Sequence, residues 1–176
     1  MKTRNALFIL VLITLSLGVQ AQRYAFIDTD YILEQIPAYT EAQTEIDAQA
    51  DKWQKQIEAR YAEIEKMYTA YKAEQVLLTP DMKKQKEQEI IEKEKQAKDF
   101  QKEKFGVSGD LFKLRQELIK PIQEEVFEAV QKMAEQRSYA VIFDKAASSS
   151  AIIYASPKYD QSDEILQRLG FSGPSE

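Results

Sequence analysis

Two seven-residue rows of apolar side chains run through the middle of this 176-residue chain and constrain its fold more than any other feature. The first row is Ala50, Ile57, Ile64, Tyr71 and Leu78, and the second is Ile46, Trp53 and Met67, interrupted by Arg60 and Glu74. Rows that alternate in steps of three and four make a narrow apolar seam on a helix. The sequence therefore predicts a long helix over about 38–78 that packs against one partner along its length.

The predicted partner is a second helix that returns antiparallel after a turn at 78–81. Thr79 is a good N-cap, Pro80 suits the first helical position, and Asp81 complements the positive end of the helix dipole. Pro80 also disfavours helical geometry at Thr79, so we expect the first helix to stop there. The return helix repeats the pattern with Ile90, Ala97, Leu111 and Leu118, beside Phe100, Val107 and Leu114, and Lys104 interrupts it. Residues 38–120 are expected to form an antiparallel helical hairpin that projects as an arm.

The start of the chain has the features of a secretory signal peptide. Lys2 and Arg4 precede an apolar stretch, and Val19-Gln20-Ala21 fits a small-residue cleavage site. We expect cleavage after Ala21, so that 176 − 21 = 155 residues remain in an exported, soluble protein. The alternative is an uncleaved anchor, for which a span of about 18 apolar residues is the usual minimum.

The composition excludes several classes of chemistry. The chain has no cysteine and no histidine, which removes the commonest metal ligands, thiol nucleophiles and general bases. Beyond the predicted signal peptide only four glycines remain, and they form no glycine-rich phosphate loop. Without Lys2 and Arg4, 24 − 2 = 22 basic residues stand against 29 acidic ones, a net charge of −7, which argues against a nucleic-acid partner. We therefore expect no enzyme activity, metal or cofactor.

Three tyrosines and three lysines are candidate contact residues for a partner. Tyr61, Tyr68 and Tyr71 follow the seam of the first helix, where they either pack against the return helix or face outward as adaptable contacts. Lys83, Lys84 and Lys86 follow the turn, within a stretch of 8 Lys and 7 acidic residues over 80–104. They indicate either a weakly packed, solvated end of the hairpin or a surface that binds anions.

Gly106 and Gly109 interrupt the return helix, and each costs about 1 kcal/mol relative to alanine in a helix interior. Folding the hairpin about Thr79 places them roughly opposite Trp53. One interpretation, slightly preferred, is that the missing side chains make room for the indole. The other is that the two glycines form a hinge.

The segments at 22–37 and 121–171 are predicted to form a β-rich body. Arg23–Asp28 and Tyr139–Asp144 have the composition of strands, and Ala151–Ala155 is predicted to pair with Tyr139–Asp144 as a hairpin. Pro121 marks the end of the arm, and a helix with Val126, Val130 and Met133 continues into the body. Residues 172–176 are expected to be a disordered tail.

Two short helices complete this body. Thr29 and Asp30 offer an N-cap for a helical turn, and Ser162 is expected to cap a last helix that buries Ile165, Leu166 and Leu169 and stops at Gly170. The carboxylate pairs Asp28 with Asp30 and Asp160 with Asp163 are interpreted as strand ends and helix caps rather than as a catalytic site.

Three strands leave open sheet edges, which predicts that several copies associate through the body. The candidate residues for this association are Tyr24, Phe26, Ile27, Tyr139, Val141, Phe143, Ile152 and Ile153.

The order and spacing of these segments resemble the Skp/OmpH family of periplasmic chaperones over nearly all of the expected mature chain. The residues that carry the resemblance are 24–28 with 36–39, the turn at 78–80, Pro121-Ile122, the strand 138–144, the segment 153–155 with 159–160, and the terminal 163–166 helix. In place of the family's Asp-Ile/Leu-Thr capping pattern, this chain has Asp160-Gln161-Ser162.

The resemblance implies an α+β fold in which three arms project from a trimeric β-barrel body and enclose a cavity. It also implies an ATP-independent holdase that binds unfolded outer-membrane β-barrel proteins in the periplasm. The acidic net charge argues against the attachment to anionic membranes or lipopolysaccharide that the basic relatives suggest. The alternative function is a structural coiled-coil tether of the cell envelope with one fixed partner.

Overall fold

The computed structural model describes residues 23–147 and 152–171. The chain divides into two compact units, one containing residues up to Tyr31 and from Glu128 onward, the other residues 32–127. The predicted arm, 38–120, lies entirely within the second unit. The predicted signal peptide, the tail at 172–176 and residues 148–151 lie outside the described residues. Long helices and a small sheet confirm the predicted α+β class.

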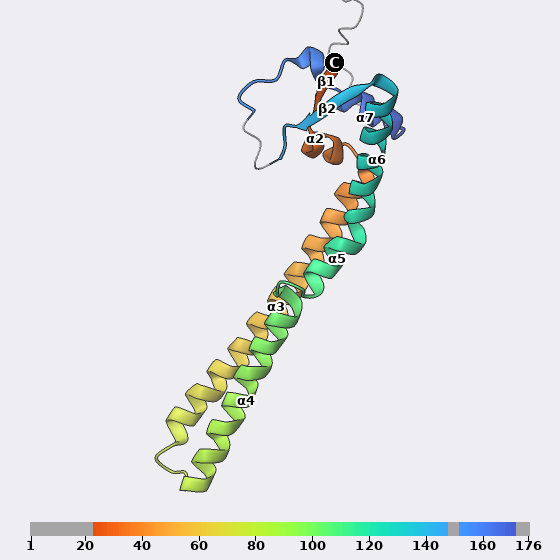
Figure 1. Cartoon of the computed structure of the whole chain (residues 1–176). Coiled ribbons are helices and arrows are strands. Elements are labelled where there is room, and N and C mark those ends of the chain that lie inside the picture. The colour runs from red at the N-terminus through yellow and green to blue at the C-terminus, as the bar shows by residue number, and fades with distance from the viewer. Residues whose placement is uncertain (1–22, 148–151, 172–176) are drawn as a thin grey trace, which may run out of the picture. The chain divides into compact units, whose positions relative to one another are not determined.

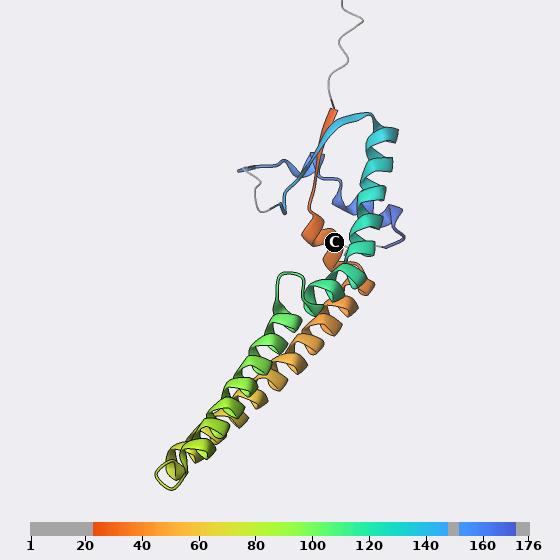
Figure 2. The ribbon, with the colours of Figure 1, turned by 60° about the horizontal axis from the view of Figure 1, so that its bottom comes forward.

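The unit at 32–127 is built on an antiparallel helical hairpin. Helix α3, Pro37–Glu74, lies beside α4, Pro80–Phe105, and then beside α5, Asp110–Leu118, as Figures 1 and 2 show. The hairpin is therefore confirmed. Its return half, however, consists of two helices rather than one.

The predicted seam is the buried line of this hairpin. Ile46, Ile57 and Ile64 are buried on α3, and Ile90 and Ala97 are buried on α4. Ile64, Ile90 and Ala97 form one cluster, and the half-buried Met67 and Tyr71 pack against it. Because charged residues surround this line on both helices, burial of the seam is the main hydrophobic stabilisation that the pairing provides.

The turn at the end of the hairpin begins earlier than predicted. Helix α3 ends at Glu74 rather than at Leu78, and the Leu77 amide donates to the Glu74 carbonyl in the reversal that follows. Residues 75–79 are needed to cross from α3 to α4. The heptad row therefore extends in the sequence to Leu78, although the helix itself has already ended. The cap is as predicted, because the Thr79 side chain accepts a 3.4 Å hydrogen bond from the Met82 amide and Pro80 opens α4.

The two glycines of the return helix bound its break. Gly106 is the C-cap of α4 and Gly109 is the N-cap of α5. A Cβ at Gly106 would collide with the carbonyl oxygen of Lys102, and one at Gly109 would lie 2.8 Å from the carbonyl oxygen of Glu103. The absence of side chains at the two glycines thus allows the loop to pass close to the backbone of the last turn of α4. The atoms nearest to both positions belong to residues 102–106 rather than to the Trp53 indole, which counts against the interpretation that the glycines make room for it.

Helix α6, Lys120–Arg137, carries Pro121 in its first turn, so a helix break lies where it was predicted, but the boundary between the two compact units falls after Phe127. Val126 and Met133 are buried and Val130 is half-buried. Ser138 then adopts a left-handed conformation with φ of 54° and turns the chain into the next strand.

The unit at 23–31 and 128–171 contains a two-stranded sheet. Strand β1, Arg23–Ile27, pairs in parallel with β2, Tyr139–Asp144, with Tyr24 opposite Val141 and Phe26 opposite Phe143. The predicted antiparallel hairpin is wrong, because no strand is present at 152–155 and β2 pairs with β1 instead. Asp160 adds one isolated bridge to Phe26 on the other side of β1.

Three short helical segments complete the described elements. They are α2, Thr29–Glu34, the 3-10 turn η2, Pro157–Tyr159, and α7, Ser162–Arg168. Ile165 and Leu166 of α7 are fully buried, as predicted. Gly170 has φ of 86° and follows α7, and the Phe171 amide donates to the Leu166 carbonyl, so the predicted stop at Gly170 is confirmed. Among residues 23–147 and 152–171, no helix has the length and apolar character needed to cross a membrane.

Candidate functional site

Two of the three predicted contact tyrosines lie on the outside of the hairpin. Tyr61 and Tyr68 follow the buried Ile57 and Ile64 by one helical turn each, so they flank the seam, and 38% and 48% of their surfaces are exposed. The Lys72 ammonium group lies 4.8 Å from the centre of the Tyr68 ring. Tyr71 instead packs against the seam cluster and donates a hydrogen bond to Glu87, which raises the pKa of its phenol.

The three predicted contact lysines lie in the first turns of α4, and they differ in their partners. Lys86 forms a 2.9 Å ion pair with Glu74 across the hairpin. Lys84 is exposed and Lys83 is half-buried. A second bridge between the helices joins Lys93 to Glu63 at 3.1 Å. Some of the lysine charge near the turn is therefore used to hold the hairpin together.

Exposed apolar side chains at the turn were missed by the sequence analysis. Val76 and Leu77 are 84% and 87% exposed, and Met82 beyond them is also exposed. Because the apolar row continued to Leu78, residues 75–78 were predicted to be helical and to pack along the seam. Their exposure was therefore not expected. The sequence signal that could have revealed them is the run of three apolar residues, 76–78, directly before the predicted turn at Thr79-Pro80.

Cations interrupt the seam where aromatic rings gather. The Arg60 guanidinium lies 4.4 Å from the centre of the Phe100 ring. Lys104 lies 5.5 Å from the Trp53 ring and 5.4 Å from the Phe100 ring, and the Trp53 and Phe105 rings meet edge to face at 6.3 Å. Such contacts are attractive because a ring face carries partial negative charge. Two of the three predicted interruptions of the seam, Arg60 and Lys104, are therefore part of its packing.

An aromatic sheet face is the clearest feature of the smaller unit. Alternate residues of a strand point to one side, so Tyr24 and Phe26 share a face with their partners Val141 and Phe143. The Phe26 and Phe143 rings stack at 5.6 Å, and Tyr24 lies 5.2 Å from Tyr159. These five residues, which we call the sheet face, are half-buried or exposed.

The other predicted association residues have different positions. Ile27 is buried and belongs to the core of its own unit, which corrects its assignment to an interface. Tyr139 lies under the Arg23 guanidinium at 5.2 Å. Ile152 is half-buried, whereas Ile153 and its neighbour Tyr154 are fully or largely exposed.

A polar network joins the ends of both strands to the start of α7. Asp28, Tyr31, Lys145, Asp160, Ser162 and Asp163 line a pocket of about 250 Å³. The Lys145 ammonium group lies 2.6 Å from Asp160 and 3.8 Å from Asp28. The bond to Asp160 raises the pKa of Lys145. Burial opposes ionisation of Asp160, but hydrogen bonds from Lys145 and Ser162 outweigh it and lower the pKa of that carboxyl.

Aspartate side chains in this network accept hydrogen bonds from amides in the first turns of α2 and α7, and the N-cap position of α7 is Gln161, which makes no side-chain cap bond. Asp28 accepts from the Tyr31 amide at 3.1 Å at the start of α2, and Asp160 accepts from the Ser162 amide at 3.0 Å at the start of α7. The predicted caps Thr29 and Ser162 instead lie inside their helices. The Ser162 hydroxyl donates to Asp160 and accepts from the Asp28 amide, so it links the two aspartates.

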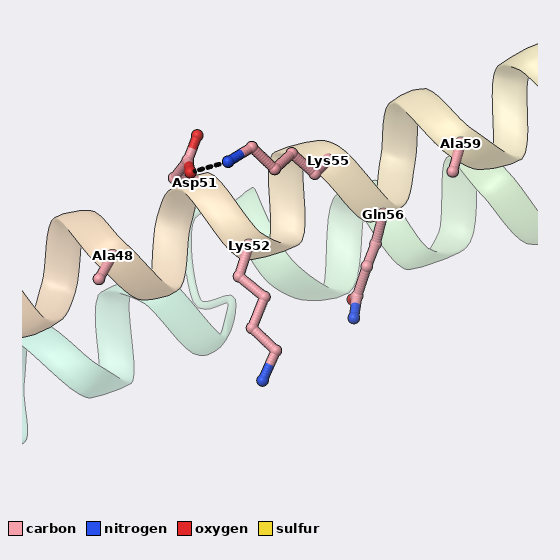
Figure 3. Close-up of a pocket in the computed structure, with 6 residues that line it drawn as sticks. All are labelled: Ala48, Asp51, Lys52, Lys55, Gln56 and Ala59. Carbon is pink, nitrogen blue, oxygen red and sulfur yellow. Dashed lines mark hydrogen bonds and ion pairs between the residues drawn. The ribbon is translucent and has the colours of Figure 1, made fainter.

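The outer face of α3 carries a shallow hollow of about 420 Å³, shown in Figure 3. Ala48, Lys52, Gln56 and Ala59 follow one another on successive turns, beside an exposed Asp51–Lys55 ion pair of 2.6 Å. Small and charged side chains on a single helix do not converge on a ligand, so this hollow is a solvated helix surface. Among residues 23–147 and 152–171, no group of acidic side chains is arranged to hold a metal ion.

Comparison with known proteins places this architecture in a family. The family model described as outer membrane protein (OmpH-like) matches residues 23–169. No curated protein sequence matches the chain at a significant level. Among solved structures, a candidate outer membrane chaperone (OmpH-like) from Caulobacter crescentus CB15 has a similar fold, with a TM-score of 0.65 and 11% sequence identity over 86% of each chain. The match to the family model spans both units, and the chain therefore belongs to the OmpH-like outer membrane protein family.

Proposed function

We propose that this protein is an ATP-independent holdase chaperone of the periplasm, which binds unfolded outer-membrane β-barrel proteins and prevents their aggregation. The observation that carries the proposal is the set of exposed apolar and aromatic side chains on an otherwise charged hairpin, Tyr61, Tyr68, Val76 and Leu77. The predicted signal peptide at 1–21 and membership of the OmpH-like family support this assignment.

The proposed contacts are weak and adaptable. A tyrosine offers a large apolar surface at a low cost in side-chain entropy, together with a hydroxyl group that can bond to an unfolded backbone. Charged side chains around Tyr61 and Tyr68 keep the hairpin soluble without a bound client. Clients would be held by many such contacts rather than in one specific pocket, so release would need no nucleotide.

We further propose that three copies associate through the smaller unit and that their hairpins enclose the client. The sheet face and the exposed Ile153 and Tyr154 support an association of this kind, because a two-stranded sheet with an exposed aromatic face is rarely stable alone. A trimer would present three copies of Tyr61 and Tyr68 to one client, which multiplies weak contacts.

The test is suppression of aggregation. An outer-membrane β-barrel protein is diluted from urea into buffer with residues 22–176 of this chain, and light scattering is followed over a range of salt concentrations. We expect suppression near one trimer per client. The double variant Tyr61→Ser/Tyr68→Ser should need at least about threefold more protein for the same protection, because clustered aromatic anchors carry much of a binding surface's energy.

The matched control is Lys52→Ser/Gln56→Ser, which changes two exposed residues of the same helix one turn apart, on the face shown in Figure 3. It should protect as well as the unmodified chain. No suppression by the unmodified chain at any salt concentration would contradict the proposal. A pull-down from envelope extracts that recovers one stoichiometric partner, without unfolded clients, would instead favour the alternative function of a structural coiled-coil tether.

A further inference from the structure

One lysine at the break between α4 and α5 lies near residues of three helices. Lys104, in the last turn of α4, forms an ion pair of 2.5 Å with Asp110, the first residue of α5. The same ammonium group lies 5.5 Å from the ring of Trp53 on α3. It also pairs with Glu103 at 2.7 Å.

The surroundings make this pair different from the other ion pairs of the hairpin. The Lys104 side chain is 16% exposed, whereas the lysines that bridge α3 and α4, Lys86 and Lys93, are each 40% exposed. Restricted solvent access reduces screening of the charge. The bonds to Asp110 and then Glu103 raise the pKa of Lys104, and the bonds from Lys104 and Lys113 lower the pKa of Asp110.

Apart from backbone hydrogen bonds within the loop and at the helix ends, and the half-buried leucines of α5, the chain at the break makes few contacts. The loop at 106–109 joins the two helices, and the Val107 side chain on it is almost fully exposed. None of the residues of α5 is fully buried. Beside the break, α3 is the one continuous helix, so bending there meets the resistance of one helix instead of two.

We propose that Lys104 and Asp110 form an electrostatic latch that holds the α4–α5 break closed against Trp53. When the latch is open, α5 and the loop separate from the end of α4, and the hairpin bends at this level while the seam beyond it stays paired. The predicted hinge at Gly106 and Gly109 would then be controlled by these charges. The latch belongs to the isolated chain and does not depend on client binding.

Trp53 is the one tryptophan of the chain, so its fluorescence reports directly on the latch. In Asp110→Asn we expect acrylamide quenching of Trp53 to increase by about twofold. Backbone amides at 102–112 should exchange with deuterium at least about threefold faster, because local opening sets their exchange rate. Amides at 85–97 should keep their rates. Lys104→Met, which keeps an apolar stem over the rings, should accelerate exchange at the same amides.

The matched control is Lys113→Gln, which removes the more exposed partner of Asp110, at 3.2 Å, and leaves Lys104 in place. It should change neither the quenching of Trp53 nor the exchange at 102–112. Asp110→Glu, which keeps the carboxylate, should give both readouts at the values of the unmodified chain. Unchanged quenching and exchange in Asp110→Asn would overturn the latch. Equal acceleration at 85–97 would overturn it too, because the pair would then stabilise the whole hairpin rather than the break.

Discussion

The Lys145 ammonium group donates a 2.6 Å hydrogen bond to the Asp160 carboxylate. Lys145 directly follows β2, and Asp160 lies two residues before α7. The same carboxylate accepts from both the amide and the hydroxyl of Ser162. One side chain therefore fixes the end of a strand and the start of a helix, and its charge is central to the stability of the smaller unit.

Asp160→Asn should reduce the free energy of unfolding at pH 7 by about 1–3 kcal/mol, because it weakens charge-assisted hydrogen bonds. Folding lowers the pKa of Asp160, so its contribution is present above the unfolded pKa of about 4 and disappears as pH falls through the folded value. Urea denaturation between pH 3 and pH 7 checks this. The variant should lose less stability on acidification than the unmodified chain, and equal losses would contradict the assignment.

Ile90 and Ile91 are neighbours with opposite environments, 5% and 63% exposed. Ile90→Ala should lower the free energy of unfolding by about 2–4 kcal/mol, because it leaves a cavity in the seam cluster. Ile91→Ala, the matched control, should change it by less than about 0.5 kcal/mol. Urea denaturation followed by circular dichroism measures both. Similar losses for the two variants would show that the heptad seam is not the packing surface.

Thr79→Ala removes the side-chain cap of α4 and should cost about 0.5–1 kcal/mol, the lower part of the usual range, because the bond to the Met82 amide is long at 3.4 Å. Thr69→Ala is the control, since the Thr69 hydroxyl only donates to the Glu65 carbonyl within α3. It should be neutral or slightly stabilising. Hydrogen exchange at 80–84 localises the effect, and a greater loss from Thr69→Ala would contradict the cap.

Ser138 adopts φ of 54° between α6 and β2, a conformation that favours glycine. Ser138→Gly should therefore stabilise the chain by up to about 1 kcal/mol, offset in part by the greater freedom of glycine when unfolded. Ser138→Val should destabilise it, since a β-branched side chain is poorly tolerated at positive φ. Thermal unfolding of the pair tests the sign, and the opposite order of midpoints would contradict the conformation.

Local signals in the sequence were sufficient for the hairpin. Ile57, Ile64, Ile90 and Ala97 are buried as their spacing predicted, and Thr79 caps α4. These features depend on neighbouring residues and on one helix pairing with the next, which periodicity reveals directly.

The sheet could not be predicted in the same way. Parallel pairing of β1 with β2 joins residues more than a hundred positions apart, such as Phe26 and Phe143, and no local pattern specifies that partner. The segment at 152–155 was assigned to a strand from its composition, but β-propensity depends on packing against neighbours.

The seam interruptions could not be understood from residue type alone. Arg60 and Lys104 break the apolar rows, yet each lies over aromatic rings of the hairpin. Similarly, Ser162 is a good capping residue by type, yet it is the first residue of α7, and its hydroxyl bonds to Asp160 and to the Asp28 amide instead.

Multi-angle light scattering coupled to gel filtration tests the central claim most directly. Residues 22–176 are run alone and after mixing with an outer-membrane β-barrel protein diluted from urea. We predict the mass of three chains alone, and a soluble complex of three chains with one client in the mixture. A monomer that leaves the client in the aggregate would contradict the proposed assembly and the proposed chaperone function together.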